Sequence, residues 1–304
     1  MIEIDNLIEE FIQYLAKEKN YSEHTLRAYG IDLREFKNFL RERGLCLENL
    51  STSLVRQYFL YLKGTNLKAS TLGRKISTLR SFLKFLLKRD FLKKNLLPKI
   101  YFKTFHSYLP FVPLEEEINQ LIDKIPVEDF KFLRTRVIFE LLYGSGLRIS
   151  ELVNLKLSDL NLEQNFIKVM GKGAKERIVP LSIKAKQVLI SYLKERDKFL
   201  KEIKKESNYL FLNRRGGRLS ERWVFEIVKK EGQKIGLFKL HPHALRHAFA
   251  THLLNAGMDI RAIQALLGHK ALITTQKYTK VQYEYLLQSY LKAHPRAKAT
   301  DDSF

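Results

Sequence analysis

Two histidines, an arginine and a tyrosine stand close together near the end of the chain. His243 and Arg246 lie in HPHALRHAFATHLL, His269 ends LLGH, and Tyr278 follows nine positions later. A phenol has a pKa near ~10, so it attacks at neutral pH only when cations or a base stabilise the phenolate. Arginine forks match the non-bridging oxygens of a phosphate and stabilise the charge of its transition state. These residue types therefore indicate attack by a tyrosine on a phosphodiester.

Two upstream cations complete this set, each beside glycine. Arg148 follows Gly146 in LLYGSGLRISELVNL, at the start of a helix whose free backbone amides also attract anions. Lys172 lies between two glycines in the turn of GKGAKERIVPL. A lysine on a mobile turn suits the general acid that protonates the leaving 5′ oxygen. Lys175 competes for this role, and either lysine could instead only bind phosphate.

The neighbours of these residues leave alternatives open. Glu151, at i+3 from Arg148, either holds a cation in place or is an ordinary first-turn acid that complements the helix dipole. His247 lies at i+4 from His243, a spacing found in zinc sites, but neither the Glu of HExxH nor a cysteine accompanies it. A metal site is the weaker interpretation. A lone histidine at a helix end, such as His269, is usually structural, but the tyrosine that follows favours a functional role.

Composition favours a polyanionic partner. The 304 residues hold 54 Lys and Arg against 33 Asp and Glu, a net charge of +21, and nucleic acid is the first partner that such a charge suggests. The sequence has no apolar run of about 18 residues, and its acidic start lacks the regions of a secretory signal. Cys46 is the single cysteine, as expected in a reducing compartment. We expect a cytoplasmic, nucleoid-associated protein without membrane partners.

The first 97 residues form one expected domain. Apolar residues recur at helical spacing from Ile2 to Arg89, which predicts four helices with Ser22 and Ser70 as caps. Their outer faces are expected to carry Arg27, Arg34, Lys68, Arg74, Lys75, Arg80, Lys84 and Lys88, interleaved with Tyr29, Tyr58 and Tyr61. We predict DNA contacts for Arg27, Arg74, Lys75 and Arg80, and for Lys175 and Arg177 farther along the chain. The alternative is an ordinary solvated face.

Three prolines and a basic aromatic stretch predict a linker over residues 98–113. A second, mainly helical domain is expected over residues 114–296, before a tail at 297–304. Within it, two β-branched runs between Asn165 and Leu181 predict a hairpin with a basic tip. A short strand is possible at residues 209–211, and the amphipathic segment 281–292 predicts a last helix.

Several ordered motifs resemble those of the tyrosine recombinases, specifically the bacterial and archaeal Xer group. They are SGLRISELVNL, GKGAKERIVPL, HPHALRHAFATHLLNAG, LLGH and TTQKYT. The N-terminal YSEHTLRAYGIDLREFKNFL is similar to the helical core-binding domain of that family. Motifs that occur in the family's order over nearly the whole chain are far more specific than any one of them alone.

The resemblance implies a mainly α fold, in which a helical, SAM-like core-binding domain precedes a mixed, mostly α catalytic domain with a small β-hairpin or sheet. The family's catalytic positions are filled by Arg148, Lys172, His243, Arg246, His269 and Tyr278, with the tyrosine as nucleophile. The position of His269 is sometimes tryptophan in the family, so its role is the least constrained. Glu151 is expected to support these residues from behind.

The resemblance also implies a mechanism and partners. A 3′-phosphotyrosyl bond stores the ester energy, so neither ATP, a metal nor another cofactor is required. Four protomers, identical or mixed with a paralogue, would bind two double-stranded DNA sites and exchange strands through a Holliday junction. The expected role is resolution of chromosome dimers at a short, dif-type inverted repeat, in some relatives with a DNA-translocating cell-division motor. The last helix would dock on a neighbouring protomer or, alternatively, on its own domain.

Four other functions compete with this one. An integrase of a mobile element belongs to the same superfamily, although no additional N-terminal arm-binding domain is evident. A type IB topoisomerase uses similar residues without strand exchange. A metal-dependent nuclease needs clustered carboxylates, which the basic motifs lack. A non-catalytic, sequence-specific DNA-binding protein would share the charge but form no covalent adduct.

Overall fold

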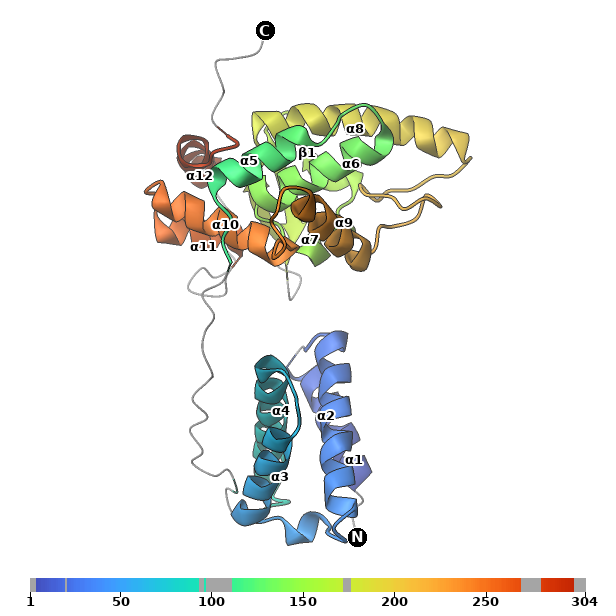
Figure 1. The fold of residues 1–304 in the computed structure, drawn as a ribbon, viewed down its shortest axis with the longest axis vertical. Coiled ribbons are helices and arrows are strands. Elements are labelled where there is room, and N and C mark those ends of the chain that lie inside the picture. The colour runs from blue at the N-terminus through green and yellow to red at the C-terminus, as the bar shows by residue number, and fades with distance from the viewer. Residues whose placement is uncertain are drawn as a thin grey trace. The chain divides into compact units, whose positions relative to one another are not determined.

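The chain folds into two compact units, residues Met1–Tyr108 and Leu109–Phe304. The computed structural model describes residues 4–19, 21–92, 96, 111–171, 176–268 and 280–297. Figure 1 shows both units, which are described separately below. No helix in these ranges has the length and apolar character that crossing a membrane requires.

Helices build the described part of the N-terminal unit. The α-helices are α1 (Ile4–Lys17), α2 (Glu23–Arg41), α3 (Thr52–Gly64) and α4 (Ala69–Lys88), with the 3-10 turn η1 (Leu47–Asn49) before α3. The Ser22 hydroxyl accepts a hydrogen bond from the amide of Thr25 and so caps α2 as predicted. Ser70, in contrast, lies inside α4, whose N-cap is Lys68. The core of this unit combines leucines and other aliphatic residues with packed aromatic rings, such as Phe11 edge-on against Phe82 at 5.3 Å.

An ion-pair network lies between α2 and α4, where the sequence predicted an exposed basic face. The Asp32 carboxylate is 2% exposed and accepts hydrogen bonds from Arg74, Lys75 and Thr78. Lys75 is itself 5% exposed and also pairs with Glu35. The expected outward position of Lys75 is therefore wrong, because its charge is neutralised inside the unit. Tyr58, at 1% exposed, is likewise a core residue.

The second unit is a helical body with a small sheet. Its α-helices are α5 (Glu115–Lys124), α6 (Phe130–Phe139), α7 (Ile149–Asn154), α8 (Ile183–Glu202), α9 (Glu221–Lys234), α10 (Pro242–Asn255), α11 (Ile260–Leu267) and α12 (Lys280–Ala293). The π-helix η2 (Glu140–Gly144) continues α6, and the 3-10 turn η3 (Leu157–Asp159) follows α7. This mostly α architecture is the one that the sequence predicted.

The sheet is antiparallel in the order β1 (Leu160–Asn161), β2 (Phe166–Met170) and β3 (Glu176–Pro180). The strands β2 and β3 pair from Phe166 opposite Pro180 to Met170 opposite Glu176, which confirms the predicted hairpin. Residues 209–211 form no separate strand. Tyr209 instead makes an isolated bridge to Lys156, which ties the segment after α8 to the end of α7.

The last helix, α12, packs on its own unit in this single chain. Tyr290 is fully buried, and its hydroxyl donates to the carbonyl of Gly144 at 2.8 Å. Beyond the helix, the buried Arg296 guanidinium pairs with Glu140 in η2 and with Asp123 in α5. The C-terminal segment therefore joins η2 to the body just ahead of the Arg148 motif.

Candidate active site

Arg148 is placed by a tight turn between η2 and α7. Gly146 has a φ of +62°, and a Cβ atom built on it would lie 2.5 Å from the Phe249 ring. Only glycine fits this turn, since it accepts positive φ and leaves room for the ring. Arg148 then serves as the N-cap of α7, with extended backbone at φ −74° and ψ 150°.

The Glu151 carboxylate is the centre of the site. It accepts hydrogen bonds from the backbone amide and the Nη1 atom of Arg148, both at 2.7 Å. The fork of Arg177 donates to both of its oxygens at 2.8 Å, and the Nη1 atom of Arg246 lies 3.8 Å from Oε2. Three guanidinium groups therefore surround one carboxylate, and Glu151 holds cations in place, the first of the two interpretations left open by the sequence.

The ionisation of Glu151 is fixed by these arginines. Burial alone would raise the pKa of the carboxyl, but the hydrogen bonds and charge of Arg177, followed by the hydrogen bonds of Arg148, lower it to about 2. Glu151 is thus an anion throughout the neutral range. Three arginines and one carboxylate leave an excess of positive charge at this site, which suits a phosphate.

Arg246 comes from α10, which Pro242 starts at its first turn. Its Nη1 atom donates to the carbonyl of Gly146, and its Nη2 atom donates to the carbonyl of Leu267 at 2.6 Å. Burial, together with the nearby charge of Arg148, lowers the pKa of the guanidinium to about 9, so it remains protonated at neutral pH. Arg246 therefore joins the turn before Arg148 to the end of α11.

The two predicted arginines thus meet at one carboxylate. Of the two predicted histidines, His243 lies within the described residues and His269 does not. His243 lies in the first turn of α10 with an exposed side chain, and His247 is also exposed. Within the described ranges, no group of three or more His, Cys, Asp or Glu side chains is arranged to hold a metal ion. The exposed His243 is available to a ligand, and its role in the reaction is still a prediction.

Four predicted site residues lie outside the described ranges. They are Lys172, Lys175, His269 and Tyr278. Described elements end shortly before these residues or begin shortly after them. Strand β2 ends at Met170 and β3 begins at Glu176, while α11 ends on the left-handed Gly268, one residue before His269. The roles of these four residues stay predictions.

Arg177 differs from its expected role. Its side chain is 6% exposed, and in addition to the fork on Glu151 its Nε atom donates to the carbonyl of Leu266 at 2.8 Å. The expected surface cation is therefore a buried partner of Glu151, because every nitrogen of its guanidinium already donates to the protein. Strand periodicity carried a signal for this position, since Arg177 shares the buried face of β3 with Val179.

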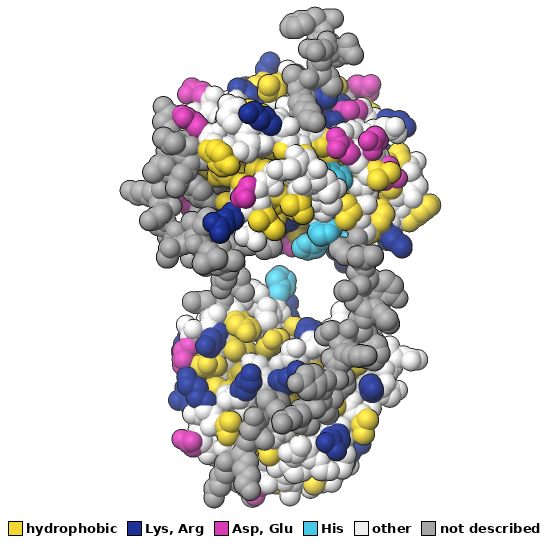
Figure 2. Space-filling model, turned by 90° about the vertical axis from the view of Figure 1, so that its left-hand side faces the viewer, with side chains coloured by type: hydrophobic (Ala, Val, Ile, Leu, Met, Phe, Trp, Pro, Cys, Tyr) yellow, Lys and Arg dark blue, Asp and Glu magenta, His cyan; other side chains and the backbone are white. Residues whose placement is uncertain are grey.

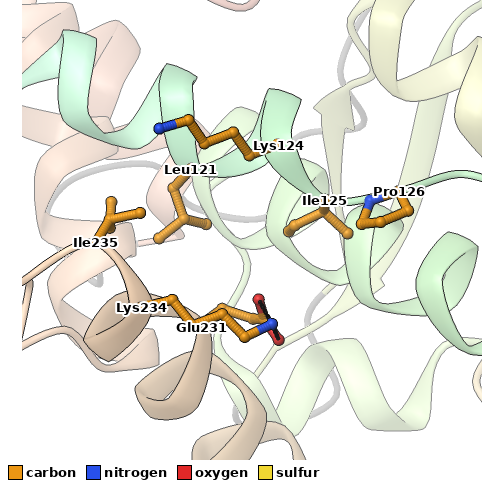
Figure 3. A pocket seen from close by; sticks show the side chains of 7 residues that line it. All are labelled: Leu121, Lys124, Ile125, Pro126, Glu231, Lys234 and Ile235. Carbon is orange, nitrogen blue, oxygen red and sulfur yellow. Dashed lines mark hydrogen bonds and ion pairs between the residues drawn. The ribbon is translucent and has the colours of Figure 1, made fainter.

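Outside the arginine cluster, a hollow of about 220 Å³ lies between α5 and α9 (Figure 3). Its lining consists of Leu121, Lys124, Ile125, Pro126, Glu231, Lys234 and Ile235. The two charged groups from α9, Glu231 and Lys234, already pair with each other at 2.7 Å. The hollow shares no lining residue with the arginine cluster, and its paired charges offer little to a phosphate.

Sequence comparison connects both units to known proteins. The profile of the phage integrase family matches residues 114–285, and that of the phage integrase N-terminal SAM-like domain matches residues 8–90. Tyrosine recombinase XerC of Staphylococcus epidermidis is 40% identical over 299 residues, covering 97% of this chain and 99% of the relative. The same-named protein of Staphylococcus carnosus is 41% identical, with the same coverage.

Comparison with solved structures agrees with the sequence comparison. The chain is similar to the crystal structure of XerH site-specific recombinase bound to difH substrate, in a pre-cleavage complex. The identity is 25% and the TM-score 0.68, over 91% of this chain and 83% of the recombinase. The sequence relatives and this structural neighbour thus extend over both units.

Proposed function

From the premise that this chain belongs to the phage integrase family and is a tyrosine recombinase, we propose that it resolves chromosome dimers at a short, dif-type inverted repeat. Two findings support this role. Both relatives named above carry the name XerC, and the structural neighbour XerH was solved bound to difH substrate. Double-stranded DNA is accordingly the expected substrate, and the cytoplasmic nucleoid the expected location.

The observation that carries the chemistry is the meeting of Arg148 and Arg246 at the Glu151 carboxylate. The protein itself holds both guanidinium groups, and Arg148, with 35% of its side chain exposed, can still reach a ligand. A phosphodiester carries one negative charge, and its transition state carries more. Two fixed cations therefore stabilise the transition state more than they stabilise the bound substrate. The arrangement suits phosphoryl transfer.

The Tyr278 hydroxyl gives up its proton to water, and its oxygen forms a bond to the scissile phosphorus. The bond from phosphorus to the 5′ oxygen breaks, and Lys172 gives that oxygen a proton. His243 and His269 complete the set of groups around the phosphate. The new 3′-phosphotyrosyl ester keeps the energy of the broken bond, so a 5′ hydroxyl from a partner strand reverses the step without ATP.

Strand exchange requires several copies. We propose that four protomers, either identical or mixed with a paralogue, bind two sites and pass through a Holliday junction. A DNA-translocating motor of cell division is a further proposed partner. The size and composition of the complex on DNA can be measured by mass photometry with and without an inverted-repeat site.

The decisive experiment uses a nicked inverted-repeat suicide substrate and the substitution Tyr278→Phe. The variant should bind DNA with unchanged affinity but form no covalent adduct, because a phenyl ring has no nucleophilic oxygen. Tyr285→Phe is the matched control, since Tyr285 is 63% exposed and should leave the adduct intact. Electrophoresis under denaturing conditions and mass spectrometry of the labelled peptide give the readout.

Three results would contradict the proposal. An adduct that persists in Tyr278→Phe would remove this residue from the role of nucleophile. Cleavage that disappears in EDTA would instead indicate a metal-dependent nuclease. Failure of the wild-type protein to form any adduct, with DNA binding intact, would favour a non-catalytic DNA-binding protein.

A further inference from the structure

Arg177 connects three separate elements of the catalytic unit. From β3, its Nη1 and Nη2 atoms donate to the two oxygens of Glu151 on α7. Its Nε atom donates to the carbonyl of Leu266 in the last turn of α11. Because the side chain is 6% exposed, water competes little for these bonds. A planar fork held at all three nitrogens has one orientation available.

The carboxylate that Arg177 orients is the one that holds Arg148. The Nη1 atoms of Arg177 and Arg148 share Oε1 of Glu151, at 2.8 Å and 2.7 Å. On the other oxygen, the Nη2 atom of Arg177 and the backbone amide of Arg148 share Oε2. A rotation of the carboxylate would therefore move the guanidinium of Arg148 and also the turn from which it projects.

Arg177 also takes the larger share of the hydrogen bonds that side chains donate to the Glu151 carboxylate, which limits how far the negative charge of Glu151 offsets the positive charge of Arg148. It makes two hydrogen bonds to the carboxylate, whereas Arg148 makes one through its side chain. The Nη1 atom of Arg246 stands at 3.8 Å, outside hydrogen-bond distance. A carboxylate relieved of Arg177 would be free to pair bidentately with Arg148, and its charge would then cancel the cation needed at the phosphate.

The Arg177 side chain passes close to a glycine. Gly268 has a φ of +66°, and a Cβ atom built on it would lie 3.0 Å from the Cδ atom of Arg177. The same glycine caps α11 in the left-handed conformation, and His269 follows it directly in the sequence. The stem of Arg177 is therefore packed against the residue that ends α11, in addition to its hydrogen bond there.

Resting on the proposed function, we infer that Arg177 is a positioning residue of DNA cleavage. It holds the Glu151 carboxylate so that Arg148 keeps both its place and its positive charge for the scissile phosphate. Arg177 itself, buried and fully engaged, does not contact the DNA.

The test is Arg177→Lys in the full-length protein, which keeps the charge but loses the fork. Single-turnover cleavage is measured on two suicide substrates, one with the natural phosphate and one with an uncharged methylphosphonate at the scissile position. The natural substrate should be cleaved about 10- to 100-fold more slowly, the range typical of residues that orient the groups in direct contact with a reaction centre. DNA affinity, measured by fluorescence anisotropy, should stay within about twofold. Arg222→Lys, at an exposed position of α9, is the matched control and should change neither quantity.

The ratio of the two cleavage rates separates positioning from folding. An uncharged linkage brings one negative charge fewer to the arginines, in the bound substrate and in the transition state, so the defect should shrink on it and the ratio of phosphate to methylphosphonate cleavage should fall about tenfold or more. Both rates come from one preparation, so a smaller folded fraction lowers them equally and leaves the ratio unchanged. An unchanged ratio would overturn the inference, as would full cleavage activity in Arg177→Lys. A wild-type protein that forms no adduct would instead contradict the proposed function.

Discussion

At the scale of single residues, the site depends on a carboxylate shared by three arginines. A buried carboxyl is ordinarily driven toward its neutral form. The pKa of Glu151 nevertheless falls to about 2, since Arg177 and Arg148 together donate four hydrogen bonds to it. Each cation in turn depends on the anion, because removal of one partner would leave buried charges without compensation.

This dependence predicts a pH-sensitive loss of stability in Glu151→Gln. The ordinary pKa of 4.5 falls to about 2 in the folded state, and a lowered folded pKa stabilises the protein above the unfolded value. The variant should therefore lose about 3 kcal/mol of unfolding free energy at pH 7. This loss should shrink as the pH falls from 4.5 toward 2, where the wild-type carboxyl becomes protonated too.

Urea unfolding at pH 7 and at pH 3, followed by tryptophan fluorescence, measures this loss. Trp223 is the single tryptophan and reports on the catalytic unit. The control is Glu206→Gln, which removes an exposed carboxylate and should have little effect. A difference between wild type and Glu151→Gln that is equally large at both pH values would contradict the assignment of the lowered pKa to Glu151.

At the scale of elements, sequence periodicity was sufficient for the helices and the hairpin but not for the contacts between distant segments. Apolar spacing predicted the pairing of β2 with β3, and the Gly-Ser-Gly sequence predicted the turn before Arg148. The position of Lys75 was not predictable from charge alone, because its partners Asp32 and Glu35 lie on another helix. The pairing of Arg177 with Glu151 was missed for a similar reason, since the two residues are 26 positions apart in the sequence.

The turn before α7 predicts a large effect of Gly146→Ala. Its φ of +62° and the 2.5 Å approach of the Phe249 ring combine backbone strain with a steric clash. We expect a loss of about 2 to 5 kcal/mol, from about 1 to 2 for the left-handed backbone and about 1 to 3 for overpacking. DNA cleavage should fall more than this loss explains, because the carbonyl of Gly146 accepts from Arg246.

Gly257→Ala is the matched control for this turn. Gly257 has a φ of +82° with open space where a Cβ would be placed. It should therefore show the backbone cost alone, with normal cleavage once the folded fraction is taken into account. Thermal unfolding of the two variants side by side separates the two contributions, and equal losses would show that the Phe249 ring moves aside without cost.

At the scale of the whole molecule, positive charge is distributed over both units. Residues 1–108 hold 20 Lys and Arg against 11 Asp and Glu, which leaves 34 against 22 in residues 109–304. Lys and Arg side chains are spread over the face of the N-terminal unit shown in Figure 2, whereas acidic side chains gather on part of the catalytic unit. Binding of a DNA duplex by both units is therefore expected to be strongly salt-dependent.

Exposed and buried cations of the N-terminal unit should respond differently to substitution. Arg27 is exposed on α2, so Arg27→Ala should weaken DNA binding and reduce the slope of log affinity against log salt by about 1. Lys75→Met should leave the slope unchanged and lower stability instead, because Asp32 loses a buried partner. Fluorescence anisotropy at several salt concentrations between about 50 and 300 mM, over which the Debye length shortens, gives both slopes. Equal slopes for wild type and Arg27→Ala would remove Arg27 from the DNA interface.

The double attachment of Arg246 has a consequence for evolution. Its guanidinium donates to two backbone carbonyls, those of Gly146 and Leu267. If Arg246 acts on the scissile phosphate as proposed, selection for a stable fold and selection for catalysis act on the same side chain, and either one alone would preserve it. A descendant that had abandoned recombination, and served only to occupy DNA, would be expected to discard its tyrosine early and to retain this arginine long afterwards.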